Sequence, residues 1–171
     1  MLVPFKDNDY EVLMSWIDSE ELNYLWGGPT FDFPLSINQL DQHYSQKGLH
    51  PYLFFYGEKP AGFVELCQID KRRQRICRVL ISNEHRGLGL SKVMLEELIS
   101  IVETDGNTDT LSLAVYTHNS AAKQCYESLG FRPVLLETAS FMFAGQSWDL
   151  IRMEMSLPRA RKNNRTSSDK A

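Results

Sequence analysis

The first fifty residues place apolar positions at helical spacing after one short strand. An apolar run over residues 2–5 predicts the strand. Asp7 or Asn8 is expected to cap a helix whose apolar face includes Leu13 and Ile17. A second helix is expected over 20–26, before two glycines and a proline that stop it, and a third over 36–46, with a serine at its first position as the cap.

The period changes near residue 50, where aromatic and β-branched residues begin to dominate. Three strands are expected over 51–57, 61–70 and 75–82, because short apolar runs alternate there with polar turns. The turns read "GEKP" and "KRRQR". This part of the chain therefore predicts an antiparallel meander.

Helices and strands alternate in the last third of the chain. A helix with apolar residues at helical spacing is expected from Leu90, and a strand over 110–117. Asn119 is a good cap for a helix that closes at Gly130. Two final strands are expected around a Gly145-Gln146 turn. The whole order predicts one mixed α/β domain over residues 1–157, with helices packed on a single sheet.

Composition agrees with a globular protein of one domain. Apolar residues make up 43% of the 171 residues and charged residues 23%, so a core can be buried. No apolar run approaches the roughly 18 residues that a membrane span needs, and the N-terminus becomes polar too early for a secretory signal. The cysteines Cys67, Cys77 and Cys125 match neither a disulfide framework nor a metal motif. We expect reduced thiols in a cytoplasmic protein, without a metal or a membrane partner.

The net charge of −4 is unevenly distributed. Residues 158–171 carry five Lys or Arg and one Asp, a net charge of +4, which leaves −8 on residues 1–157. An acidic body argues against a nucleic-acid partner. The basic tail lacks large apolar residues, and we interpret it as a disordered, solvated end.

A glycine loop joins the third strand of the meander to the next helix. Its residues, Arg86 to Ser91, read "RGLGLS". The spacing fails the Walker pattern, and a dinucleotide fingerprint would need a third glycine where Lys92 stands. The remaining pattern is Arg-x-x-Gly-x-Ser, in which backbone N–H groups at a helix start form an anion cradle. A tight strand-to-helix turn explains the same residues equally well.

A second segment points to the same kind of ligand. Asn119 and Tyr126 are two helical turns apart and share a face, with Ala122 between them. A small residue at that place would let a ligand lie along the helix. Without the glycine loop, Tyr126 would be interpreted as an ordinary aromatic residue of an amphipathic helix.

Together the two segments resemble the GNAT superfamily of N-acetyltransferases. "RGLGLS" is similar to the family's pyrophosphate loop, and "N-x-x-A-x-x-x-Y-x-x-x-G-F" from Asn119 to Phe131 to its second cofactor segment. The resemblance covers roughly residues 51–157. It implies a mixed, mostly antiparallel sheet of six to seven strands flanked by helices, and acetyl-CoA as the acetyl donor. Ser91 departs from the usual Gly or Ala, but it is small and keeps its N–H.

The resemblance also implies the site residues. The strand end before the loop would offer backbone groups to the pantetheine arm and to the thioester carbonyl, and Tyr126 would act as general acid toward the leaving thiolate. The implied cofactor-binding residues are Val79, Leu80, Ile81, Arg86, Gly87, Leu88, Gly89, Leu90, Ser91, Asn119, Ala122 and Tyr126.

The general base is less clearly indicated. Some members of the family that acetylate ribosomal proteins carry a glutamate where this chain has Ala114. Glu65 on a neighbouring strand is our catalytic candidate, acting directly or through water, although an ion-paired or solvated carboxylate explains it as well. His118, beside Asn119, could also relay a proton.

The acceptor amine is expected to bind near the first helices. Acidic and aromatic side chains gather there, namely Trp16, Asp18, Glu20, Glu21, Trp26 and Asp32. They suit a small cationic amine. A solvated helix face with two core tryptophans explains the same residues. We therefore predict direct acetyl transfer to a primary amine, in an enzyme that could form the homodimers common in the family. The alternatives are a protein N-terminal or lysine acetyltransferase and an acyl-CoA-binding module without turnover.

Overall fold

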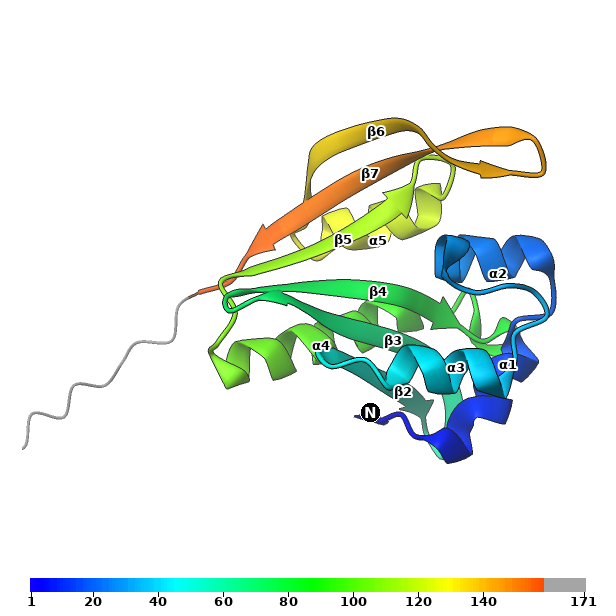
Figure 1. The fold of residues 1–171 in the computed structure, drawn as a ribbon. Helices are drawn as coiled ribbons and strands as arrows, with labels where there is room; N and C mark the ends of the chain where they lie inside the picture. The colour runs from blue at the N-terminus through cyan, green and yellow to red at the C-terminus, as the bar shows by residue number, and fades with distance from the viewer. Residues whose placement is uncertain (159–171) are drawn as a thin grey trace, which may run out of the picture.

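The computed structural model describes residues 1–158, so the predicted tail lies outside the described residues except for Pro158. One seven-stranded sheet runs through the molecule in the order β1-β2-β3-β4-β5-β7-β6 (Figure 1). Its strands are β1 (Leu2–Pro4), β2 (Leu49–Tyr56), β3 (Lys59–Asp70), β4 (Arg73–Ile81), β5 (Thr110–Tyr116), β6 (Arg132–Phe143) and β7 (Gln146–Ser156). All neighbouring pairs are antiparallel except β4 and β5. The predicted mixed, mostly antiparallel sheet is confirmed.

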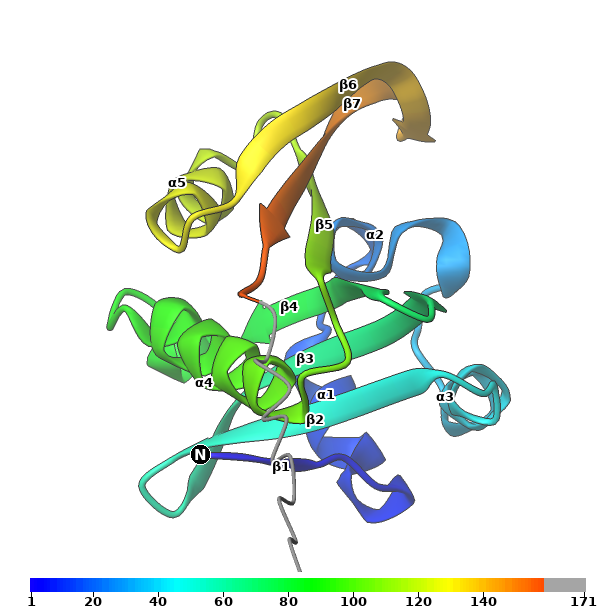
Figure 2. The same cartoon turned by 90° about the vertical axis from the view of Figure 1, so that its left-hand side faces the viewer.

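The helices cover the two faces of the sheet separately. The α-helices are α1 (Tyr10–Trp16), α2 (Glu20–Gly27), α3 (Ile37–Tyr44), α4 (Leu90–Asp105) and α5 (Ser120–Ser128), and the short 3₁₀ turns are η1 (Asp7–Asp9), η2 (Gly28–Thr30) and η3 (Asn83–His85). Figure 2 shows α4 and α5 on one side of the sheet and α2 and α3 on the other.

Two hydrophobic cores match these two layers. The side chains that α4 buries, such as Met94 and Leu98, pack with Leu111 and Met153 of the sheet. On the other face, residues of α1 to α3 pack around Phe63. The central strands are therefore covered on both faces, whereas most of the edge strand β6 is exposed.

Two predicted boundaries are wrong for reasons that the hydrogen bonds show. The first helix begins at Tyr10, because residues 7–9 form a 3₁₀ turn in which the Asp9 carboxylate accepts from the Lys6 N–H at 2.8 Å. The basic turn after β3 is shorter than "KRRQR". Arg73 is already paired in β4, opposite Asp70, and its guanidinium meets Glu154.

Candidate active site

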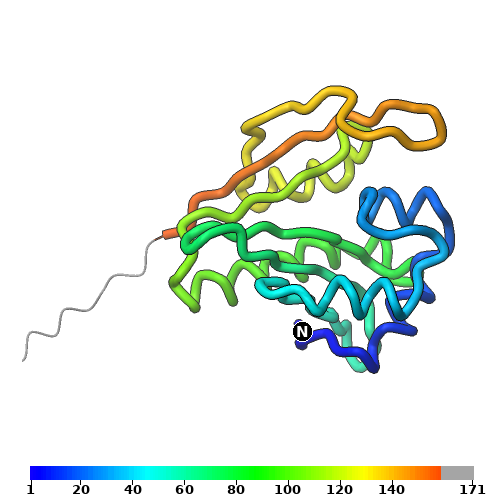
Figure 3. Tube along the Cα trace, viewed as in Figure 1, coloured from blue at the N-terminus to red at the C-terminus, as the bar shows by residue number. Residues whose placement is uncertain are grey.

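Strands β4 and β5 separate soon after they meet. Their parallel pairing covers only residues 73–75 against residues 110–112, although both strands continue beyond it. The Cα trace shows the two strands diverging toward the end where α2 lies (Figure 3). A cavity of about 530 Å³ lies between them, with walls from β4, β5, α2, α5 and the start of α4. This cavity is the candidate cofactor site.

A bulge in β4 shapes one wall of the cavity. The pairing with β3 passes from Phe63–Leu80 to Glu65–Cys77, so β4 holds one residue more than β3 in this stretch. Arg78 lies in this bulge with φ of 53°, a conformation that is uncommon for a residue with a side chain. Its carbonyl accepts from the indole N–H of Trp26 at 2.9 Å. The bulge therefore interrupts the ladder and is fixed to α2.

The glycine loop closes one end of the cavity. Gly87 and Gly89 have φ of 77° and 73°, and a Cβ built on either would meet nothing within 4 Å. Gly89 is the N-cap of α4, whose first N–H groups have no acceptor within the helix. The Arg86 side chain turns back, and its Nε donates to the Ile81 carbonyl at 3.2 Å. Open space, orphan N–H groups and one cation fit the pyrophosphate of acetyl-CoA.

Helix α5 forms the opposite wall. The side chain of Asn119 accepts from the Ala122 N–H at 3.2 Å, so its predicted role as a cap is confirmed. Tyr126 is only 7% exposed and lines the cavity. Burial raises the pKa of Tyr126, with smaller contributions from Cys125 and Cys77. Its phenol is therefore protonated at neutral pH, as a general acid must be.

The structure brings nearly all of the predicted cofactor residues together. Every one of them lines the cavity except Leu88, whose side chain is 60% exposed at the tip of the loop. Of the other candidates, His118 is an exposed residue whose ring lies 4.5 Å from that of Trp148. Leu22, Leu25 and Trp26 of α2 also line the cavity. Sequence periodicity does not reveal that contact, because α2 is far from the cofactor motifs along the chain.

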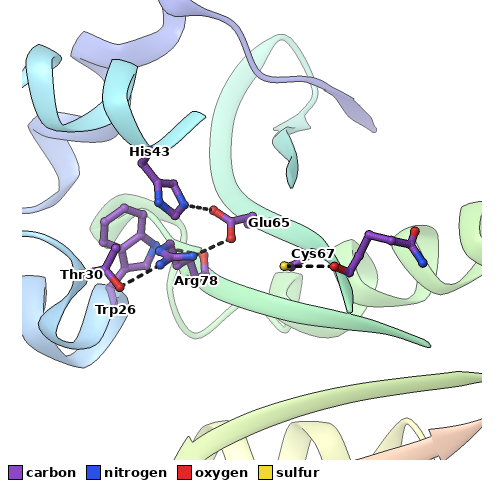
Figure 4. Close-up of polar contacts among 7 residues, drawn as sticks. Trp26, Thr30, His43, Glu65, Cys67 and Arg78 are labelled. Carbon is purple, nitrogen blue, oxygen red and sulfur yellow. Dashed lines mark hydrogen bonds and ion pairs between the residues drawn. The ribbon is translucent and has the colours of Figure 1, made fainter. Parts of the chain in front are cut away.

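Glu65 is placed differently from the other candidates. Its side chain is 1% exposed and lines neither this cavity nor a second one beside α2 and η2. One carboxylate oxygen meets Arg78 Nη1 at 2.5 Å and the other meets His43 Nε2 at 2.8 Å (Figure 4). Both oxygens are thus occupied, and an ionised carboxylate requires the His43 Nε2 to carry the proton. This is the ion-paired carboxylate that the sequence left open.

A second cavity of about 380 Å³ lies next to α2, η2 and the turn between β6 and β7. Glu20 and Asp32, two of the predicted acids, line it, and the described residues of its wall include no Lys or Arg. Its other lining residues are Asn23, Tyr24, Pro29, Phe31, Phe33, Met142, Phe143 and Ala144. The stacked rings of Trp26 and Phe31, 5.3 Å apart, lie between the two cavities, because Trp26 lines the first and Phe31 the second.

Comparison with known proteins now identifies the family. The family model described as Acetyltransferase (GNAT) family matches residues 13–131. The chain belongs to this family. The GNAT match includes β4, β5, the glycine loop and α5, which form much of the first cavity.

One relative and two solved structures show how far the similarity extends. Probable N-acetyltransferase san of Drosophila melanogaster is 33% identical over 112 residues, which are 61% of this chain and 59% of that protein, so the match spans less than two thirds of the relative. The spermidine N-acetyltransferase of Vibrio cholerae, solved with CoA and spermine, has a TM-score of 0.79 at 21% identity, covering 91% of this chain and 94% of that one. The ribosomal-protein-S18-alanine N-acetyltransferase of Escherichia coli has a TM-score of 0.75 at 20% identity, covering 95% and 97%. The two structures share the fold.

Proposed function

We propose that this GNAT protein transfers an acetyl group directly from acetyl-CoA to a primary amine of a small cationic molecule. The observation that carries the proposal is the pair of cavities on either side of the Trp26–Phe31 stack. The first offers an anion cradle and a buried phenol, and the second offers carboxylates and aromatic rings. The proposal requires a donor in the first cavity and an acceptor in the second to meet past this stack, near the end of β4.

The first cavity supplies the groups that hold and activate the donor. Acetyl-CoA supplies the thioester when it is bound. The N–H groups of the glycine loop and the start of α4 would hold its pyrophosphate, and the bulged end of β4 would offer backbone groups to the acyl arm. Tyr126 would deliver a proton to the departing sulfur, since burial keeps the phenol protonated.

The second cavity supplies the groups that would hold the acceptor. Glu20 and Asp32 provide negative charge, which attracts a cationic amine and raises its local concentration. Tyr24 and Phe143, with ring centroids 5.1 Å apart, offer aromatic faces to an ammonium group. An ammonium ion must lose a proton before it attacks, and water in the open cavity is the proposed acceptor of that proton.

Acetyl transfer to a panel of amines tests the proposal directly. The panel contains spermidine, spermine, an aminoglycoside, and peptides with a free N-terminal amine or lysine, and thiol release is measured together with the mass of the product. We expect the polyamines or the aminoglycoside to be acetylated fastest, with weaker activity at high salt. A preference for the peptides would favour a protein N-terminal or lysine acetyltransferase.

Thermal melting distinguishes binding from turnover. A ligand at 100 times its dissociation constant adds about 2.7 kcal/mol of stability. We expect acetyl-CoA to raise the melting temperature, and NAD and ATP to leave it nearly unchanged. A shift with acetyl-CoA but no acetylated amine would support an acyl-CoA-binding module, and no shift would contradict the cofactor site.

The cellular compartment of the protein is also part of the proposal. No helix of residues 1–158 is long and apolar enough to cross a membrane. The free thiols of Cys67, Cys77 and Cys125 suit a reducing compartment, and we propose the cytoplasm. Whether two copies pair in solution is measured by light scattering on the purified chain.

A further inference from the structure

Arg78 contacts the surroundings of both cavities at once. It lines the first cavity itself, and its backbone forms the bulge in β4 and accepts from Trp26, another lining residue. Its guanidinium donates to Thr30 Oγ1 at 3.0 Å, from Nη2, and lies 5.3 Å from the centroid of the Phe31 ring. Phe31 lines the second cavity, and Thr30 lies in the chain between Phe31 and Pro29, which lines it too.

Glu65 holds this guanidinium in place. The Arg78 side chain is 12% exposed and that of Glu65 1%, so the pair is largely removed from water. A buried ion pair stays favourable only with good geometry and further hydrogen bonds. His43 provides one of these bonds, since its Nε2 lies against the second oxygen of Glu65 at 2.8 Å. Figure 4 shows the resulting chain of contacts from His43 through Glu65 and Arg78 to Thr30.

The conformation of the bulge depends on this chain of contacts. A residue other than glycine at φ of 53° is strained, and it keeps that conformation only when its surroundings fix it. At Arg78 the surroundings act on both sides of the Cα atom, through Trp26 on the carbonyl and Glu65 on the side chain. The guanidinium that Glu65 fixes also donates to Thr30, so the η2 segment is bonded to β4 at the bulge.

We propose that Arg78, held by Glu65, is a positioning residue that fixes the acceptor wall at Thr30 and Phe31 relative to the cofactor strand β4. Glu65 is then a partner for Arg78 and not the base. The inference rests on the proposed function, because it takes the second cavity, which Phe31 lines, as the amine cavity. Loss of the Arg78–Thr30 bond moves the amine relative to the thioester without emptying the cofactor site.

Two mild substitutions separate this role from folding. Thr30→Val keeps the shape of an exposed side chain and removes the acceptor of the Arg78 bond. Arg78→Lys keeps the charge beside Glu65, but one ammonium group cannot reproduce the forked contacts of a guanidinium. Arg73→Lys is the matched control, since Arg73 forms an ion pair with Glu154 at the other end of the same strand.

The readouts are amine KM, kcat, the Kd of acetyl-CoA and the Kd of spermidine in the presence of CoA. For Thr30→Val and Arg78→Lys we expect the KM and the Kd for the amine to rise about tenfold, as for the loss of one charge-assisted hydrogen bond. In Thr30→Val, which lies outside the lining of the first cavity, the Kd of acetyl-CoA should stay within about threefold, and Arg73→Lys should resemble the wild type. Glu65→Gln should raise amine KM in the same direction and keep the shape of the pH–rate profile, whereas removal of a base would abolish its acidic limb.

The possible failures are distinguishable. An active wild type whose Thr30→Val and Arg78→Lys variants keep amine KM within twofold would overturn the positioning role alone. Equal losses in acetyl-CoA and amine binding in Thr30→Val would also overturn it, since they indicate general damage to the sheet. If Arg78→Lys does not fold, Thr30→Val decides the question. A wild type that neither binds nor acetylates any amine would contradict the proposed function and this inference together.

Discussion

The two cavities are built from different kinds of groups. The first cavity, which is the proposed cofactor cavity, uses backbone: two glycines at positive φ, the N-terminus of α4 and the part of β4 that no longer pairs with β5. The second, which is the proposed amine cavity, uses side chains, with two carboxylates and four aromatic rings from α2, the segment after η2 and the end of β6. One site is therefore fixed by chain geometry, and the other by which side chains meet there.

This difference predicts how the two sites respond to substitution. A backbone cradle should tolerate changes in side chains that point away from it, such as that of the exposed Leu88. It fails when a glycine gains a charge or loses its conformation. A site made of side chains changes its ligand with each replacement and leaves the fold alone. Substrate choice can thus vary while the donor stays the same.

The largest expected effect is on chemistry within the cofactor cavity. Tyr126→Phe removes the phenolic proton donor and keeps the ring against Phe131, 6.3 Å away. General acid catalysis contributes about 10²–10⁴ to a rate, and we expect kcat to fall by about 100-fold or more. The Kd of acetyl-CoA should change by less than about threefold. Steady-state kinetics and calorimetry measure the two effects separately.

The pH dependence of kcat gives a second check on Tyr126. Because burial raises its pKa above the ordinary value of 10, the phenol keeps its proton through neutral and mildly alkaline pH, and loss of activity from its ionisation should begin only above about pH 10. An alkaline limb near pH 8 that disappears in Tyr126→Phe would contradict this assignment.

The next effect tests the cradle itself. Gly89→Asp places a carboxylate where the pyrophosphate should bind, and Asp is among the residues that visit the left-handed region most readily. Two charges about 4 Å apart repel by about 4 kcal/mol at an effective dielectric of 20, so the Kd of acetyl-CoA should rise by about 100-fold or more. Gly89→Asn is the neutral control, and its Kd should rise by less than tenfold. Equal effects of the two variants would mean that shape, and not charge, is being measured.

Sequence could predict the elements around the first cavity because they follow local spacing. The order of elements, the caps Ser36 and Asn119, and the glycine loop before α4 all depend on neighbours within a few residues, and the structure agrees with them. The contacts of Glu65 are different. Its partners His43 and Arg78 are 22 and 13 residues away, and no short pattern shows that both meet one carboxylate. The bulge at Arg78 was equally hidden, because an ordinary apolar strand surrounds it.

Charge removal in the amine cavity should have a smaller effect than either change in the cofactor cavity. Glu20→Gln and Asp32→Asn each remove one carboxylate from an exposed wall, where ion pairs contribute about 0.2–1 kcal/mol. Each variant should raise the KM of a cationic amine by about two- to fivefold, and the double variant by about tenfold. Glu21→Gln, on the same helix but outside the cavity lining, is the matched control.

Salt gives an independent check on the amine cavity. The advantage of the wild type over the double variant should shrink as ionic strength rises from 0.01 to 1 M, because the Debye length falls from about 30 to 3 Å. The KM of acetyl-CoA should be equal in the two proteins. Unchanged amine kinetics in the double variant would remove the electrostatic argument for a cationic acceptor.

The smallest effect concerns Asn119, which serves the fold and is proposed to serve the cofactor. Its side-chain oxygen already caps α5, so only its amide N–H₂ group remains free to reach a ligand. Asn119→Ala removes the cap, which costs about 1 kcal/mol and lowers the melting temperature by about 2–4 °C. Asn119→Asp keeps a good cap and replaces the donor by an acceptor. We expect Asn119→Asp to melt like the wild type and to bind acetyl-CoA more weakly. If both variants bind acetyl-CoA normally, Asn119 belongs to the fold alone, and the backbone of the loop carries the cofactor with less help from side chains than we propose.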